Sequence, residues 1–275
     1  MKEKIQIIFT DLDGTLLNRD KKISRVNYAR LEELGRHKVV RVIATGRSLY
    51  SFRCLFPDQV PADYLIFSTG AGIVDLNTKE LIYSANIGKH DIRKISSYLQ
   101  EQQADFMVHH TVPDNHRFFY WGDVLSNSDF KRRIDLYRVY AQEFTSLESL
   151  PESSAQIIAI FSEDPVQFNL VKVGLGDYQI TRTTSPLDGK SIWMEILPSH
   201  VGKGAAAAWL CSRLKLDRRF SVGIGNDYND LSLLQFTEHS FVVAEAPQEM
   251  LENFPATCSH DDDGFHHAIR IVLEL

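Results

Sequence analysis

The sequence predicts an α/β protein with a parallel sheet, into which a second α+β domain is inserted. Two observations lead to this prediction. Strand-like apolar runs alternate with helical patterns up to about residue 80 and again after about residue 200. Such an order builds a parallel sheet through right-handed crossovers. The stretch between is richer in strands, and a length of 275 residues favours about two domains.

The first 70 residues carry three strand-like runs with helical patterns between them. Branched and aromatic residues bounded by turns are typical of buried strands, and apolar residues spaced three to four apart are typical of helices. The second helix ends at Pro57, because proline interrupts a helix. The expected elements are strand 5–10, helix 24–37, strand 39–44, helix 49–56 and strand 64–68.

From about Leu81 onward, the expected strands and helices no longer alternate regularly but follow an α+β order. The elements expected there are helix 92–103, strands 105–110 and 117–121, helix 130–144, strand 156–161, helix 166–175, and strands 178–183 and 192–196. The alternating order returns with an Ala-rich helix after Lys203 and a strand at 221–224. We therefore expect one domain from residues 1–81 and 188–275, and a second from residues 82–187.

Composition and charge exclude several classes of partner. A formal net charge of −6 argues against nucleic acid or an anionic membrane surface, because both attract basic faces. The three cysteines are widely separated and follow no metal-binding spacing, which is typical of reduced residues in a cytoplasmic protein. The first strand begins almost at the N-terminus and no long apolar segment follows, so we expect neither a signal peptide nor a membrane span.

Two carboxylates come directly after the first strand. Asp11 and Asp13 stand two residues apart in the string Asp-Leu-Asp-Gly-Thr-Leu, so alternation along the chain lets both point the same way. Ligands bind at this end of the strands in open α/β sheets. Two neighbouring like charges are costly unless a cation or a shared proton relieves them.

Three further motifs follow in a fixed order. The strand at 39–44 ends in Thr45-Gly46-Arg47, Lys203 opens a predicted helix, and residues 225–230 read Gly-Asn-Asp-Tyr-Asn-Asp after another strand. Together with the Asp11 motif, this set resembles the haloacid dehalogenase (HAD) superfamily, in its Cof-like subfamily IIB. The resemblance implies a Rossmann-like HAD core with an inserted cap domain of type C2B.

The same resemblance implies an activity. It suggests a Mg²⁺-dependent phosphomonoesterase that acts on small phosphorylated metabolites, with sugar phosphates first, through an aspartyl-phosphate intermediate. The partner would be a small-molecule phosphate ester, and the protein a monomer or homodimer. Two alternatives stay open, which are a phosphotransferase of the phosphomutase type and a non-catalytic regulatory binding protein.

The resemblance also assigns roles to residues. Asp11 would attack phosphorus and Asp13 would serve the leaving group as acid and base. The implied catalytic set is Asp11, Asp13, Thr45 and Lys203. The implied substrate-binding set is Thr45, Gly46, Arg47, Lys203 and Asn229. The implied Mg²⁺ ligands are Asp11, Asp13 through its backbone carbonyl, Asn226 and Asp230.

Two points stay open within this assignment. Asn226 stands where the family motif carries its first aspartate, so Mg²⁺ affinity should fall, unless Asp227 or Asp230 reaches the metal. Arg47 either anchors an anionic substrate or forms a salt bridge in the core. In the inserted domain, we expect His110, His116 and Arg117 to discriminate among substrates.

Overall fold

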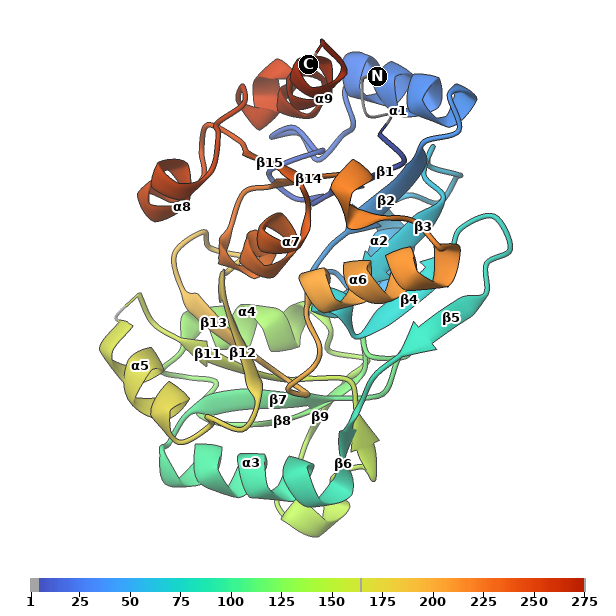
Figure 1. Cartoon of the computed structure of the whole chain (residues 1–275). Coiled ribbons are helices and arrows are strands. Elements are labelled where there is room, and N and C mark those ends of the chain that lie inside the picture. The colour runs from blue at the N-terminus through green and yellow to red at the C-terminus, as the bar shows by residue number, and fades with distance from the viewer. Residues whose placement is uncertain (1–4, 164, 275) are drawn as a thin grey trace. The chain divides into compact units, whose positions relative to one another are not determined.

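The computed structural model describes residues 5–163 and 165–274, which form two compact units. The first unit contains the described residues up to Gly46, the segment Phe56–Tyr83, and the chain from Gly202 onward. The second contains Arg47–Leu55 and the described residues between Ser84 and Val201. Figure 1 shows the chain coloured along its sequence.

The first unit is built on a seven-stranded sheet in the order β15-β14-β1-β2-β3-β4-β5. Pairing is parallel from β15 to β3, whereas β4 runs antiparallel to β3. The predicted α/β core is therefore confirmed, with an antiparallel edge that the sequence pattern did not indicate. The strands are β1 (Ile7–Thr10), β2 (Val40–Ala44), β3 (Tyr64–Phe67), β4 (Gly72–Asp75), β5 (Leu81–Ser84), β14 (Ser221–Gly225) and β15 (His239–Val242).

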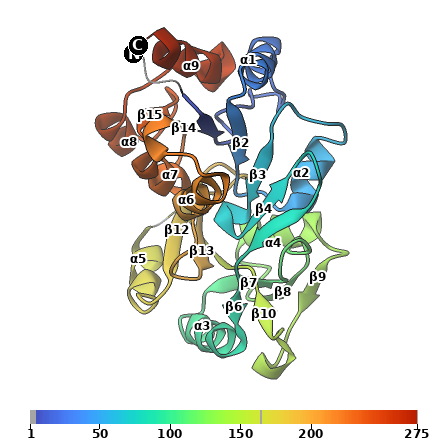
Figure 2. The same cartoon turned by 45° about the vertical axis from the view of Figure 1, so that its right-hand side comes forward.

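Helices cover this sheet on both faces. Ile7, Phe9 and Val42 pack with Ala207 of α6 (Lys203–Leu214) and Leu233 of α7 (Leu231–Phe236). Alternate strand residues point away from that cluster, toward α1 (Arg25–Arg36) and α9 (Gly264–Glu274), which lie side by side in Figures 1 and 2. A short α8 (Gln248–Asn253) packs beside α7.

The second unit holds a six-stranded sheet in the order β12-β13-β11-β7-β8-β9 and a two-stranded ladder of β6 and β10. One face packs against α3 and α5, and the other against α4. The strands are β6 (Ile87–Gly88), β7 (Asp105–His109), β8 (Phe118–Trp121), β9 (Ala141–Glu143), β10 (Ser153–Ser154), β11 (Ile157–Phe161), β12 (Gln179–Thr184) and β13 (Ile192–Leu197). The helices are α2 (Leu49–Leu55), α3 (Lys89–Glu101), α4 (Ser128–Leu136) and α5 (Pro165–Val173).

Two sequence expectations differ from this arrangement. The helix expected over 130–144 is wrong in its second half, because α4 ends at Leu136 and β9 pairs in parallel with β8. The edge of β8 offers hydrogen bonds that the local apolar spacing does not reveal. The second unit also runs to Val201, beyond the boundary expected near 187, because β13 lies between β11 and β12.

Within the described ranges 5–163 and 165–274, no helix combines the length and apolar character needed to cross a bilayer.

Candidate active site

Three neighbouring parallel strands of the first unit each end in a residue predicted for the site. Asp11 follows β1, Thr45 follows β2, and Asn226 follows β14. Hydrogen bonds continue the ladders past the strand ends, since the Asp11 N–H donates to the Ile224 carbonyl at 2.8 Å and the Thr45 N–H to the Ile66 carbonyl at 2.9 Å. The backbone therefore fixes these residues at one edge of the sheet, where α/β proteins bind their ligands.

Lys203 is a fully buried ammonium between two carboxylates. Its Nζ lies 2.6 Å from Oδ1 of Asp11 and 2.5 Å from Oδ1 of Asp230, and the exposed fraction of Lys203 is 0%. The first turn of α6 carries this residue, and α6 sits close against α7. A Cβ at Gly204 would lie 2.2 Å from the Ser232 carbonyl oxygen, so only glycine allows this approach. Three sequence-predicted site residues are thus brought together.

The electrostatics of this cluster follow from burial and pairing. Burial alone would lower the pKa of Lys203, but Asp11 and Asp230 raise it above its ordinary value, so the ammonium stays charged. Burial raises the pKa of Asp11 to about 7 against the opposing effect of Lys203, and Asp230 adds to the rise. A further positive charge beside Asp11 would lower this pKa and favour the carboxylate form.

Both carboxylate oxygens of Asp230 accept hydrogen bonds from other groups of the protein. Oδ1 accepts from Lys203, and Oδ2 accepts from the N–H groups of Asn226 at 2.8 Å and Asp227 at 3.2 Å. Asp227 caps the short 3₁₀ turn Tyr228–Asp230 by accepting from the Tyr228 N–H at 2.8 Å. Asp230 therefore orients Lys203 and the loop that carries Asn226.

The side-chain amide of Asn226 lies among oxygen atoms of the first motif. One of its terminal atoms is 3.2 Å from Oδ2 of Asp11, 3.3 Å from the carbonyl oxygen of Asp13 and 3.3 Å from Oγ1 of Thr15. A 180° turn of the amide exchanges oxygen and nitrogen at this point. The turn that presents Asp13 needs Gly14, whose φ is +76° and whose Cβ would lie 2.6 Å from Nδ2 of Asn226.

This donor set fits Mg²⁺. With the amide oxygen turned inward, three oxygens converge from Asp11, Asp13 and Asn226, and they repel one another unless a cation lies among them. Octahedral Mg²⁺ with oxygens at 2.0–2.1 Å separates adjacent ligands by about 3.0 Å, close to the 3.2 and 3.3 Å spacings here. The described residues contain no cluster of three His, Cys, Asp or Glu side chains suited to a metal, but an amide and a backbone carbonyl lie outside that class of donors.

Thr15 is a neighbour of the site that sequence reasoning did not select. Its hydroxyl donates to the Asn226 amide oxygen at 3.3 Å, and its side chain is fully buried. Thr15 belongs to the same Asp-Leu-Asp-Gly-Thr string, so its place in that motif was the available signal. Asp13 is partly exposed and lies 3.6 Å from the ammonium of Lys21.

The other predicted residues lie after β2 and in the 3₁₀ turn that follows β14. Thr45 is buried and its carbonyl accepts from the Thr69 N–H at 3.1 Å, while Gly46 ends the first unit's segment. Arg47 opens the segment that belongs to the second unit, and its Nη1 donates to Oγ of Ser51 at 3.0 Å. Asn229 is half-buried in the 3₁₀ turn.

The turn predicted to discriminate substrates lies between β7 and β8 of the second unit. The His116 ring stacks on Tyr50 at 4.5 Å and meets the edge of Tyr140 at 4.7 Å between ring centroids. The His110 ring stacks on Phe119 at 5.3 Å. Burial lowers the pKa of both histidines. Aromatic packing accounts for the placement of these two rings, and their role toward substrate stays a prediction.

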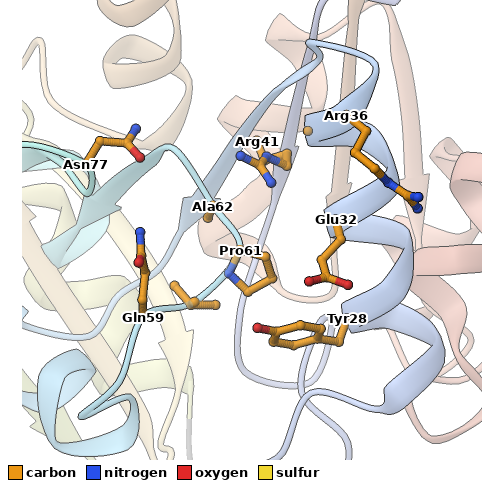
Figure 3. Close-up of a pocket in the computed structure, with 10 residues that line it drawn as sticks. Tyr28, Glu32, Arg36, Arg41, Gln59, Pro61, Ala62 and Asn77 are labelled. Atoms are coloured by element: carbon orange, nitrogen blue, oxygen red, sulfur yellow. The ribbon is translucent and has the colours of Figure 1, made fainter.

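A hollow of about 720 Å³ lies elsewhere in the first unit, lined by Tyr28 and Glu32 of α1 and by the 59–62 segment (Figure 3). It adjoins Arg41 near the start of β2, whereas Thr45 follows the opposite end of that strand. The Arg41 guanidinium is already paired with both carboxylate oxygens of Asp63, at 2.7 and 2.9 Å. This hollow is therefore separate from the acid–lysine cluster.

Comparison with known proteins identifies the family of this chain. A family model of haloacid dehalogenase-like hydrolases matches residues 8–269. The chain belongs to this family. It is 25% identical over 290 residues to 5-amino-6-(5-phospho-D-ribitylamino)uracil phosphatase YwtE of Bacillus subtilis, with 98% of each protein covered. The HAD resemblance inferred from the four motifs is thus confirmed, and the chain is a HAD-type phosphatase.

Solved structures of HAD proteins share the fold. The HAD phosphatase BT1666 from Bacteroides thetaiotaomicron matches with a TM-score of 0.82 at 19% identity, over 99% of this chain and 97% of that one. The HAD subclass IIB sugar phosphatase BT4131 matches with a TM-score of 0.78 at 16% identity, over 98% of this chain and all of that one. Both matches span the core and the inserted domain, which confirms the predicted fold class.

Proposed function

We propose that this HAD phosphatase is a Mg²⁺-dependent phosphomonoesterase for small phosphorylated metabolites, with sugar phosphates as the first class to test. The observation that carries the proposal is the contact of Asp11 with both a buried ammonium and a set of oxygen donors. Oδ1 of Asp11 lies 2.6 Å from Lys203, and Oδ2 lies 3.2 Å from the Asn226 amide. One carboxylate is thereby placed between a fixed positive charge and a candidate cation site.

In the first half-reaction, Oδ1 of Asp11 attacks phosphorus and the bond from phosphorus to the ester oxygen breaks. The leaving oxygen takes a proton from Asp13 and departs as an alcohol, which leaves an aspartyl-phosphate. In the second, Asp13 accepts a proton from water, the water oxygen attacks phosphorus, and Asp11 is released with inorganic phosphate. Asp13 is suited to both transfers because it is partly exposed beside the buried nucleophile.

The remaining residues hold the phosphoryl group. Lys203 and the N–H groups at the start of α6 favour anionic oxygens, and the Thr45 hydroxyl and Gly46 backbone add donors at the neighbouring strand end. Arg47 and Asn229 complete the proposed substrate contacts. Asp11, the Asp13 carbonyl and Asn226 would hold Mg²⁺, which screens charge on the phosphoryl oxygens when bound. We place Asp230 as the orienting partner of Lys203 and as a charged support for this site.

We also expect the enzyme to act in the cytoplasm, as a monomer or homodimer. The support for the cytoplasm comes from its three free cysteines, of which Cys54 lies on α2, Cys211 on α6 and Cys258 in the loop after α8.

The test is phosphate release from p-nitrophenyl phosphate and from a panel of sugar phosphates. We expect Asp11→Asn to lose activity by about a thousandfold or more, because an amide is a poor nucleophile toward phosphorus. Asp13→Asn should also lose turnover and accumulate phosphoenzyme with a good leaving group. EDTA should abolish release, and Mg²⁺ should restore it.

The matched control is Asp20→Asn, the same chemical change on an exposed side chain, which should keep parental activity. Near-parental turnover in Asp11→Asn with normal folding contradicts the covalent mechanism. Transfer of the phosphoryl group to a second sugar, with no free phosphate, points instead to the phosphomutase class.

A further inference from the structure

The atoms that would contact the cation directly carry little negative charge of their own. Of its three donors, the Asp13 carbonyl and the Asn226 amide are neutral. The third donor, Asp11, already shares its charge with Lys203 at 2.6 Å. Mg²⁺ sheds its water reluctantly and is usually held by one or two carboxylates together with substrate phosphates. These protein donors alone therefore compete poorly with water for Mg²⁺.

Asn226 also satisfies the site without a cation. When its nitrogen is turned inward, the amide donates to Oδ2 of Asp11 at 3.2 Å and to the Asp13 carbonyl at 3.3 Å. The positive end of the amide dipole then stands where the cation would be. Binding Mg²⁺ requires the amide to give up these two hydrogen bonds and to turn its oxygen inward. A carboxylate at this position would have no such alternative.

We infer that this enzyme takes up Mg²⁺ together with the phosphate group of its ligand, and binds the cation only weakly before it. The inference rests on the proposed function. A phosphate dianion supplies the oxygens and the negative charge that the donor set lacks. Because Lys203 is already paired with Asp11 and Asp230, the cation is left to balance most of the added charge. Because binding linkage is reciprocal, Mg²⁺ must tighten phosphate binding by the same factor.

The experiment is calorimetric titration of the full chain with MgCl₂, with and without saturating inorganic phosphate. For the parent protein we expect phosphate to lower the Mg²⁺ dissociation constant by about tenfold or more. For Asn226→Asp we expect about tenfold tighter Mg²⁺ binding in the absence of phosphate, because a unit charge is added beside the cation. In that variant, phosphate should change the constant by less than about threefold.

The control is Asn253→Asp, which adds the same charge to an exposed position on α8 and should keep the parental coupling. Melting temperatures give a second readout, since EDTA should lower that of Asn226→Asp by more than that of the parent.

Equal Mg²⁺ affinity with and without phosphate in the parent protein overturns the inference, even if phosphatase activity stands. Parental coupling in Asn226→Asp overturns the role of Asn226. Phosphate release that is insensitive to EDTA, with no Mg²⁺ binding in either protein, overturns the proposed metal dependence and this inference with it.

Discussion

In the first unit a buried ammonium lies between two carboxylates, whereas in the second a buried imidazole lies against a backbone carbonyl. Lys203 contacts Asp11 and Asp230. His109 has an exposed fraction of 0%, and its Nδ1 lies 2.7 Å from the Asn115 carbonyl oxygen. Among the described residues, its Nε2 has no hydrogen-bond partner.

These two surroundings have opposite effects on charge. The carboxylates keep Lys203 charged, whereas burial lowers the pKa of His109 to about 3, aided by the nearby guanidinium of Arg133. The acid–lysine cluster therefore keeps the charges that phosphoryl chemistry needs. In the second unit, burial keeps His109 neutral. Burial of a titratable side chain identifies a candidate active site only when opposite charges accompany it.

The largest expected effect comes from removing a cation, either Lys203 in the first unit or Arg133 near His109 in the second. Lys203→Met should lower the free energy of unfolding by about 3–5 kcal/mol, because two buried carboxylates lose their counter-ion. Arg133→Met should cost about 1–2 kcal/mol, since it loses mainly a cation–π contact with Tyr137 at 4.0 Å and aliphatic packing. Urea titrations followed by circular dichroism measure both. Equal losses of unfolding free energy in the two variants would remove the distinction between the surroundings of Lys203 and those of His109.

A second effect concerns pH. Below pH 6.5 the unfolded chain protonates His109 but the folded chain does not until about pH 3, so stability falls as pH falls through this window. His109→Gln should remove this contribution, which is about 1.4 kcal/mol for each pH unit between 6 and 4. Melting temperatures of parent and variant measured across this range give the difference.

The control for this pH effect is His200→Gln, at an exposed position of the same unit, which should keep the parental pH dependence. A parental slope in His109→Gln would mean that another group sets the acid sensitivity of the second unit.

The smallest effect is expected at the far end of the first unit's sheet. Arg41→Lys replaces the two-pronged contact with Asp63 by a single ammonium, at a cost of about 1 kcal/mol. Phosphate release should be unchanged, because Arg41 lies near the opposite end of β2 from Thr45. Lost activity with normal stability would show that the hollow beside Arg41 takes part in function.

Much of the first unit was predictable because its strands are local apolar runs. Strand β1 and the turn after it follow from branched residues ending in an Asp-x-Asp-Gly string, and the contact with β14 follows from parallel topology. Strand β4 was missed because it is four residues long and follows a turn in which Ser68, Thr69 and Gly70 have positive φ. Such a turn depends on tertiary contacts more than on local propensity.

Within the site, residue types were predictable but their pairing was not. Four motifs indicated Asp11, Lys203 and Asp230 as members of one site. Sequence reasoning placed Asp230 at the metal site as a charged support, which stays a prediction, and it did not indicate that its oxygens contact Lys203 and two backbone N–H groups. Nothing in the local pattern indicates which oxygen faces which donor, since that depends on how α6 and the loop after β14 approach each other. In the second unit, the failure over 137–144 has the same origin, because β9 forms an edge strand by pairing with β8.

The order of the strands also determines when during synthesis the chemistry becomes possible. Strand β1 lies between β2 and β14, and Asp11 is separated by 192 residues from the lysine that neutralises it. A nascent chain can pair β1 with β2 early, but one edge of β1 stays open until β14 has left the ribosome. Closing so long a loop is entropically costly, so completion of this edge belongs late in folding. Phosphatase activity therefore requires synthesis at least as far as Asp230, because no partly made chain that ends before this residue contains the assembled cluster.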